Sequence, residues 1–124
     1  MKEAIIIGLG GFTGSISRYM LGLAITRAFP SVMPLGTLSI NLIGCLLIGF
    51  LYGEAEKQVW LNQQYLLFLV VGFCSSFTTF STFAHDNLAL LRSGEYATVI
   101  TYALISLIAG IILVWVGYII ASKI

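Results

Sequence analysis

The stretch GFCSSFTTFSTFAHDN, residues 72–87, mixes phenyl rings and hydroxyls in a chain that is otherwise dominated by aliphatic residues. On a helix, at about 100° per residue, the two kinds of side chain separate onto roughly opposite faces. The hydroxyl face comprises Ser75, Thr78, Thr79 and Thr82, and the phenyl face comprises Phe73, Phe77, Phe80 and Phe83. β-Branched and aromatic residues around a Ser-Ser pair are poor helix formers, so the stretch also predicts a break in the helix.

A break at membrane depth has chemical consequences. It frees backbone carbonyls and amides, which are tolerated in a bilayer only where they are buried in protein or line a cavity. Freed carbonyls suit a hard cation such as Na⁺, whereas hydroxyl donors and ring edges suit a small anion. The alternative is that the rings pack the core and the hydroxyls bond back to their own helix.

The composition of this chain predicts that it lies in a lipid bilayer. The 124 residues are 59% hydrophobic and only 9% charged, so a small water-soluble domain could not cover the apolar surface, and an integral membrane protein is predicted. The net charge of +1 comes without a basic run, which argues against a nucleic-acid binder. Cys45 and Cys74 lie in apolar segments and are interpreted as buried small side chains rather than a disulfide or a metal pair.

The apolar segments predict an all-α protein with one four-helix transmembrane domain over residues 1–124. Charged and polar residues separate four segments, each close to the roughly 20 residues that a helix needs to cross the hydrocarbon core. The approximate spans are 4–26, 34–53, 65–84 and 96–121. His85 and Asp86 are interpreted as lying at the end of the third span, near water.

The loop charges give little direction to insertion. Four crossings place Lys2, Lys57 and Lys123 on one side of the membrane and Arg27 and Arg92 on the other, a count of three against two. The positive-inside rule is then nearly balanced, so the chain is predicted to insert in both orientations and to pair with its own inverted copy. The alternative is that another signal fixes the orientation.

Polar groups recur at four-residue spacing on the other three helices. Arg18 lies in a stripe with Gly10, Gly14 and Gly22, which is predicted to face protein; Arg18 either fixes helix contacts or lines an anion path. Thr37 and Asn41 share a face of the second helix, where the Asn41 amide suits either an anion or a neighbouring helix carbonyl. The fourth helix carries Thr98, Tyr102 and Ser106, a candidate polar track.

Other chemistry is missing from the sequence. Spans one, two and four contain no buried Asp or Glu, so proton-coupled exchange lacks its usual intramembrane carboxylate. No glycine-rich phosphate loop, metal-ligand cluster or nucleophile–base set is visible, and the single histidine is interpreted as a solvated helix-end residue. The sequence therefore predicts a passive pathway for a small anion rather than an enzyme.

Three motifs resemble those of the CrcB/Fluc fluoride channels. They are GFTGSISRY at residues 11–19, GTLSINLIG at 36–44 and TTFSTF at 78–83, and the resemblance extends over all four spans. The third motif is specific, whereas the glycine pattern of the first would be weak alone. One departure is Ser75-Ser76, which stand where the family commonly has Gly-Gly.

The resemblance implies an antiparallel, dual-topology homodimer in the bacterial inner membrane, with a broken third helix and two fluoride pathways. It implies passive export of fluoride that protects the cell from fluoride toxicity, with Phe80 and Phe83 offering ring edges to the anion. The implied pathway residues are Asn41, Phe80, Phe83, Ser81, Tyr102, Ser106 and Thr37. The resemblance also implies a structural Na⁺ at the dimer centre, held by the main-chain carbonyls of Ser75 and Thr78.

Two other classes of protein compete with this interpretation. A small dual-topology multidrug/proton exporter also has four short helices, but it needs a carboxylate in the first span that is missing here. A membrane scaffold without transport would explain the small-residue stripes but not polar stripes on three helices. Selectivity for fluoride requires many weak donors that replace its hydration shell, which hydroxyls, an amide and ring edges provide.

Overall fold

The computed structural model describes residues 1–57 and 62–124, and within these ranges the secondary structure is helical. Part of the loop predicted at 54–64, and with it residues 58–61 of the predicted domain, lies outside the described residues. The elements in chain order are α1 (Lys2–Ala28), α2 (Leu35–Glu56), α3 (Gln63–Leu66), the π-helix η1 (Leu67–Cys74), α4 (Ser75–Phe77), α5 (Phe80–Arg92) and α6 (Tyr96–Lys123).

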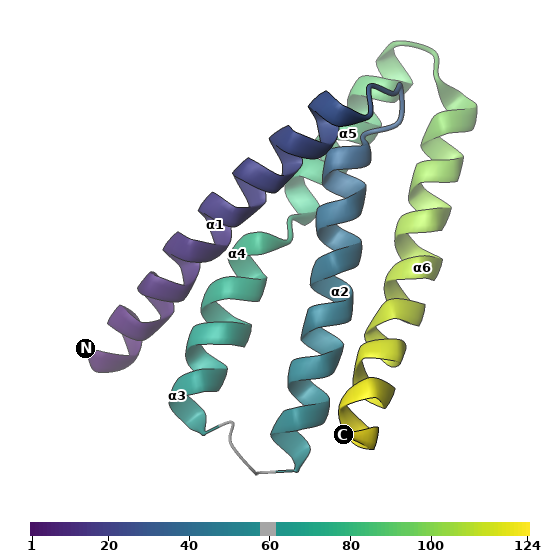
Figure 1. The fold of residues 1–124 in the computed structure, drawn as a ribbon. Coiled ribbons are helices and arrows are strands. Elements are labelled where there is room, and N and C mark those ends of the chain that lie inside the picture. The colour runs from purple at the N-terminus through teal and green to yellow at the C-terminus, as the bar shows by residue number, and fades with distance from the viewer. Residues whose placement is uncertain (58–61) are drawn as a thin grey trace.

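Four helical stretches are long and apolar enough to cross a membrane. They are Lys2–Ala28, Leu35–Glu56, Gln63–Arg92 and Tyr96–Lys123, which agree in number with the four predicted spans. The four stretches run alternately up and down, so the two termini lie toward the same end of the molecule (Figure 1). This arrangement is the one expected of an even number of crossings.

Helical structure extends beyond the end of the third predicted span, 65–84. Helical structure continues to Arg92, so His85 and Asp86 lie inside α5 rather than beyond the end of a helix. Two polar side chains near the predicted end form hydrogen bonds within the fold: Asp86 Oδ2 accepts from the Tyr102 hydroxyl at 3.2 Å, and Asn87 Nδ2 donates to the Phe83 carbonyl at 2.8 Å, while Asn87 Oδ1 is buried without a partner among the described residues. Paired polar groups therefore do not interrupt this helix.

Glycines bring helix backbones together at two interfaces, one between α1 and η1 and the other between α2 and α6. A Cβ at Gly10 would lie 3.0 Å from the Gly72 Cα, and a Cβ at Gly14 would overlap the Phe73 carbonyl, so α1 packs directly on η1. On the other side of the molecule, a Cβ at Gly49 would lie 2.8 Å from the Val114 carbonyl carbon. The predicted glycine stripe of the first helix therefore faces protein, as small residues do where membrane helices pack closely.

The buried side chains form two small clusters. Leu51, Val70 and Cys74 make one between α2 and η1, where the 1% exposed Cys74 matches its predicted role as a buried small side chain. Leu38, Leu90 and Tyr102 make the other, between α2, α5 and α6. Most remaining large apolar side chains of α1 and α6 are exposed, as expected of surfaces that face lipid.

Polar contacts join the ends of α2 and α6. Lys57 Nζ forms an ion pair with Glu54 at 3.2 Å and donates to the Ala121 carbonyl in the last turn of α6. The Tyr118 hydroxyl donates to Glu56 Oε2 at 2.5 Å. A cation at a helix C-terminus also opposes the negative end of the helix dipole. These contacts hold the last turn of α6 against α2.

Candidate functional site

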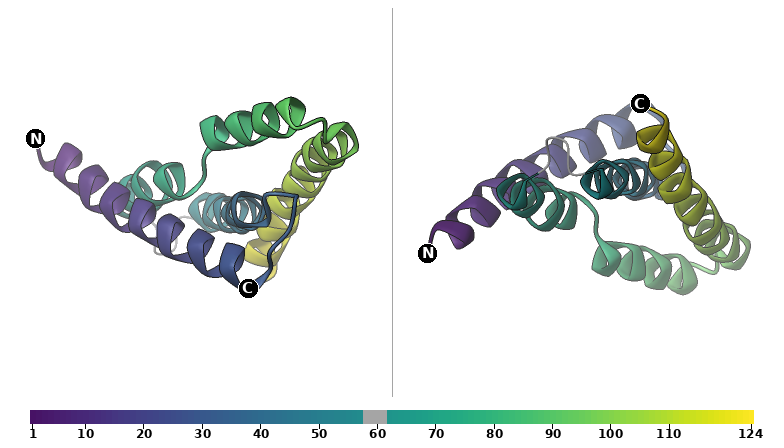
Figure 2. Two further views of the ribbon diagram at one scale, coloured as in Figure 1. Left: turned by 90° about the horizontal axis from the view of Figure 1, so that it is seen from above. Right: turned by 90° about the horizontal axis from the view of Figure 1, so that it is seen from below.

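Thr78 and Thr79 connect α4 to α5 in an extended conformation, with φ/ψ of −84°/158° and −153°/117°. We call these two residues the 78–79 segment. Figure 2 shows, from above and from below, that α5 is displaced sideways from the axis of η1 and α4. Thr79 caps α5 because its Oγ1 accepts from the Thr82 amide at 3.3 Å, while the Thr78 hydroxyl donates to the Cys74 carbonyl at 2.9 Å.

Asn41 of α2 binds the backbone of the 78–79 segment. Its Oδ1 accepts from the Thr79 amide at 2.9 Å, and its Nδ2 donates to the Thr79 carbonyl at 3.3 Å. The sequence left two partners open for this amide, an anion or a backbone carbonyl of a neighbouring helix. The structure contains the bond to a neighbouring backbone. A carboxamide nitrogen has two N–H groups, so one donor remains beyond this bond.

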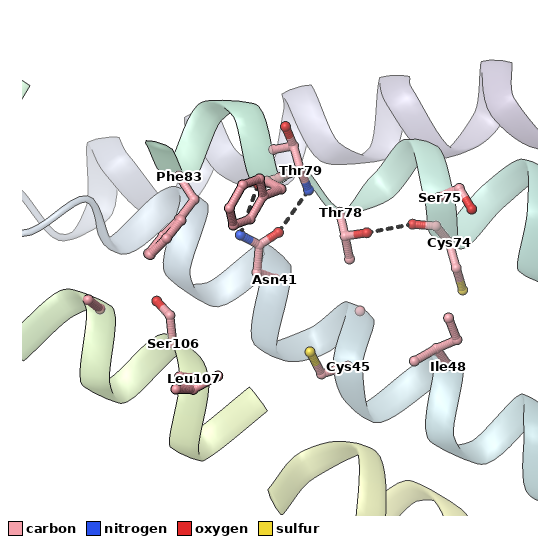
Figure 3. Close-up of a pocket in the computed structure, with 13 residues that line it drawn as sticks. Asn41, Cys45, Ile48, Cys74, Ser75, Thr78, Thr79, Phe83, Ser106 and Leu107 are labelled. Carbon is pink, nitrogen blue, oxygen red and sulfur yellow. Dashed lines mark hydrogen bonds between the residues drawn. The ribbon is translucent and has the colours of Figure 1, made fainter. Parts of the chain in front are cut away.

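A cavity of about 440 Å³ lies beside the 78–79 segment, between α2, the third span and α6. Figure 3 shows Asn41, Thr78 and Thr79 at its wall, with Phe83 on one side and Ser106 below. Its polar side chains are neutral amides and hydroxyls, and within the described ranges no charged side chain lines it. Such a site offers weak donors and aromatic edges without a deep electrostatic trap.

The two predicted phenyl rings both line this cavity. Phe80 and Phe83 lie with ring centroids 5.8 Å apart at an interplanar angle of 37°, and Phe83 in turn contacts Tyr102 with centroids 5.0 Å apart at 54°. Phe83 is half-buried, whereas Phe80 is 80% exposed. The edge of each ring is the positive part of its aromatic quadrupole.

Ser106 of α6 contributes an unusual polar atom to the cavity. Its Oγ is buried and has no hydrogen-bond partner among the described residues. Buried hydroxyls nearly always have a partner, so an unpaired one in a cavity wall is suited to a ligand or to water. This is the strongest indication that the polar track of the fourth helix has a role beyond packing.

Other predicted site residues do not line the cavity. Tyr102 is completely buried behind Phe83, with Thr37 at its hydroxyl. Ser81 is exposed, and its Oγ lies 3.3 Å from Thr79 Oγ1. Arg18 is half-buried in α1 and forms no ion pair within the described part of the chain.

Asp86, which the sequence placed at a helix end near water and not among the candidate site residues, interacts with the site through the Tyr102 hydroxyl. Because the two residues are 16 positions apart on different helices, no local spacing could have identified the pair. The only available signal was the rarity of an acidic residue within a long apolar chain.

The backbone at the 78–79 segment fits the carbonyl ligands of a cation in part. In a continuous helix the Thr79 amide would donate to the Ser75 carbonyl, but here it donates to Asn41, so the Ser75 carbonyl loses that partner. Thr78 is itself extended, with a ψ of 158°, so its carbonyl does not continue the direction of the carbonyls in α4. The Cys74 carbonyl, in contrast, already accepts from both the amide and the hydroxyl of Thr78.

Comparison with known proteins identifies the family of this chain. Residues 5–118 match the family described as "CrcB-like protein, Camphor Resistance (CrcB)". The chain belongs to this CrcB-like family. The match extends into all four spans and includes Phe80, Phe83, Asn41 and Ser106.

Similar proteins extend over nearly the same length as this CrcB-like chain. A protein of Azobacteroides pseudotrichonymphae is 41% identical over 122 residues, covering 98% of each chain. Proteins of Bacteroides fragilis and Phocaeicola vulgatus are 45% and 42% identical, covering 94% of this chain and 94% and 96% of their own. Each of these relatives is named "Fluoride-specific ion channel FluC".

Proposed function

We propose that this protein is a fluoride-selective channel that lets fluoride leave the cell passively, down its electrochemical gradient, and so protects the cell from fluoride. The observation that carries the proposal is the near full-length similarity to proteins named fluoride-specific ion channels, together with a neutral cavity walled by Phe80, Phe83, Asn41 and Ser106. No ATP or coupling ion takes part in this process.

The chemistry of the cavity supports an anion path. Fluoride is small and strongly hydrated, so a path must replace its water with many weak contacts rather than one strong cationic site. The buried Ser106 hydroxyl offers a free donor, and the Phe80 and Phe83 edges offer a weakly positive surface. Thr37, Ser81 and Tyr102 extend the proposed pathway beyond the cavity wall.

We further propose that residues 63–92 form a single crossing whose helix is broken at the 78–79 segment. This segment lies near the middle of that crossing, where only a protein environment satisfies backbone polar groups. Arg18 serves in this proposal as a helix-contact residue in the glycine stripe of α1, because its neighbours in the stripe pack on other backbones.

The functional unit in this proposal is an antiparallel homodimer in the bacterial inner membrane, with both orientations of the chain present. Two observations support it: the near balance of Lys and Arg between the two ends, and an 80% exposed Phe80 beside the cavity that a second copy would cover. Each copy would contribute to two fluoride pathways.

A structural Na⁺ belongs to the same proposal. The main-chain carbonyls of Ser75 and Thr78 would hold it, since the first has lost its helical partner and the second lies outside the helical ladder. Such an ion would supply a fixed positive charge between the two copies. The cation would therefore favour the dimer, and Na⁺ removal is expected to lower the fraction of dimer in detergent.

Fluoride efflux from liposomes tests the function. We expect purified protein to release fluoride from loaded liposomes, measured with a fluoride electrode, without a proton gradient and with little release of chloride. A rate equal to that of protein-free liposomes would refute the channel. A rate that depends on a proton gradient would instead favour the exporter class.

A further inference from the structure

Asn41 interacts with both backbone polar groups of a single residue. Oδ1 accepts from the Thr79 amide and Nδ2 donates to the Thr79 carbonyl, at 2.9 Å and 3.3 Å (Figure 3). These partners fix the orientation of the carboxamide, because a backbone N–H requires an acceptor and a carbonyl requires a donor. The side chain therefore pairs with Thr79 in the way that a peptide group of a neighbouring strand would.

This pairing replaces bonds that the helix no longer supplies. Thr78 and Thr79 are extended, so the Thr79 amide cannot donate to the Ser75 carbonyl as in a continuous helix. An unpaired backbone group in a membrane has no water to bind and is strongly unfavourable. The bonds from Asn41 therefore stabilise the extended conformation of the 78–79 segment.

The position of Thr79 determines where the rings lie. Thr79 immediately precedes Phe80, and its hydroxyl caps α5 by accepting from the Thr82 amide at 3.3 Å. A displacement of Thr79 would therefore move the first turn of α5, which carries both Phe80 and Phe83.

Gly44 allows the segment to come this close to α2. A Cβ at position 44 would overlap Thr78 Cγ2 and would lie 3.5 Å from Phe77 Cδ1. Gly44 is three residues after Asn41 on the same helix, so the two lie on one face. The missing side chain at position 44 and the carboxamide at position 41 thus serve the same contact.

We propose that Asn41 is a positioning residue for fluoride conduction: by binding both backbone groups of Thr79, it holds the start of α5 and so places the phenyl rings of Phe80 and Phe83. This inference rests on the proposed channel function and deepens it. It differs from a role as an anion ligand, in which the important partner of the Asn41 amide would be fluoride itself.

Backbone amide exchange tests the positioning role without any transport measurement. In protein labelled with ¹⁵N-threonine, we expect Asn41→Ala to accelerate exchange of the Thr79 amide by about tenfold or more, because the amide loses its acceptor. The Thr79 signal is assigned by its loss in Thr79→Ser. The matched control is Asn87→Ala, which removes a carboxamide that bonds only to its own helix, at the Phe83 carbonyl.

A second variant leaves the carboxamide intact. Gly44→Ala displaces Thr78, so we expect it to accelerate Thr79 exchange and to lower the maximal rate of fluoride efflux at least tenfold, although no proposed ligand is removed. Its matched control is Gly53→Ala, which introduces a similar clash at the far end of α2, where the added Cβ would lie 2.7 Å from the Ala121 Cβ. Gly53→Ala should leave Thr79 exchange unchanged.

Flux measured against fluoride concentration separates the two roles. For a positioning residue, Asn41→Ala should lower the maximal rate while the half-saturating fluoride concentration stays within about threefold. Unchanged Thr79 exchange in both Asn41→Ala and Gly44→Ala, or a rise in half-saturating fluoride at an unchanged maximal rate, would overturn the inference. If the unmodified protein does not conduct fluoride, the proposed function fails, whereas the exchange experiment still reports on Asn41.

Discussion

The two faces of α2 are held in different ways. Against α6, α2 packs backbone to backbone through glycines: an added Cβ would lie 2.8 Å from the Val114 carbonyl carbon at Gly49, and 2.8 Å from the Phe50 backbone nitrogen at Gly117 of α6. Against the 78–79 segment, α2 uses hydrogen bonds from one side chain, Asn41. The difference follows from the backbone: a continuous helix satisfies its own polar groups and requires only shape, whereas an extended segment requires partners from elsewhere.

The comparison predicts that polar or aromatic changes near the 78–79 segment will mainly affect conduction, whereas changes to the glycine contacts between α2 and α6 will mainly affect stability. The largest expected effect is on the rings of the cavity. Phe80→Ile and Phe83→Ile should each reduce fluoride efflux by about 100-fold, equivalent to about 2.7 kcal/mol in the barrier, because an aliphatic side chain has no positive ring edge.

Liposome efflux measures these two variants, and size-exclusion chromatography verifies that each remains folded. Phe12→Ile is the matched control, since it replaces a 65% exposed ring on α1, away from the cavity. Undiminished flux in both cavity variants would eliminate the ring-edge mechanism.

A substitution in the glycine-packed face of α2, which contacts α6, should lower the free energy of unfolding. Gly49→Ala is expected to lower the free energy of unfolding by about 2 kcal/mol, because the new Cβ would lie 2.8 Å from the Val114 carbonyl carbon and the helices must separate. Reversible unfolding in mixed micelles, followed by circular dichroism, measures the change. Gly8→Ala is the control, because no atom lies within 4 Å of its added Cβ; equal losses in both variants would mean that close packing is not the cause.

A smaller effect is expected where α5 meets α6. Tyr102→Phe keeps the ring that contacts Phe83 but removes the hydroxyl that donates to Asp86, so unfolding should become easier by about 1.5 kcal/mol. The same micelle assay applies. Tyr19→Phe, at a 70% exposed position of α1, should change little, and an equally small change in Tyr102→Phe would show that the buried bond contributes no stability.

The smallest expected effect is in the turn between α5 and α6. Gly94 has a φ of +77°, which other residues adopt at a cost of about 1 kcal/mol, so Gly94→Ala should destabilise the protein by about that amount. Space is not the cause, since no atom lies within 4 Å of an added Cβ. Gly94→Asn, whose side chain tolerates this conformation better, should recover part of the loss; a variant as stable as the parent protein would exclude backbone strain at this turn.

The sequence predicted the number of helices well because hydrophobic length is a local property. It also predicted that Gly10 and Gly14 face protein, since four-residue spacing alone indicates a helix stripe. The expectation that a helix ends at His85 and Asp86 was wrong: both residues lie inside α5, where Asp86 pairs with Tyr102, 16 positions further along the chain.

Prediction of the site from the sequence was also limited by contacts between residues that lie far apart in the chain. Asn41 and Ser106 were identified from residue type and spacing, and Phe80 and Phe83 from the family resemblance; the structure brings all four to one cavity. The pairing of Asn41 with Thr79 is a contact between residues 38 positions apart, and the sequence left it as one of two alternatives. Tyr102 was placed on the polar track by its spacing, but side-chain packing puts it behind Phe83.

The contact between Lys57 and the Ala121 carbonyl has a practical consequence for measuring distances in the membrane. Because the last turn of α6 is tied to the end of α2, a nitroxide attached through Ser122→Cys would sit on a helix with a fixed direction. Spin–spin distances between copies would then report the relative orientation of the helices themselves, because motion of the labelled helix end would add little to the width of the distance distribution. Parallel and antiparallel pairs would give different distances, so one label could distinguish them.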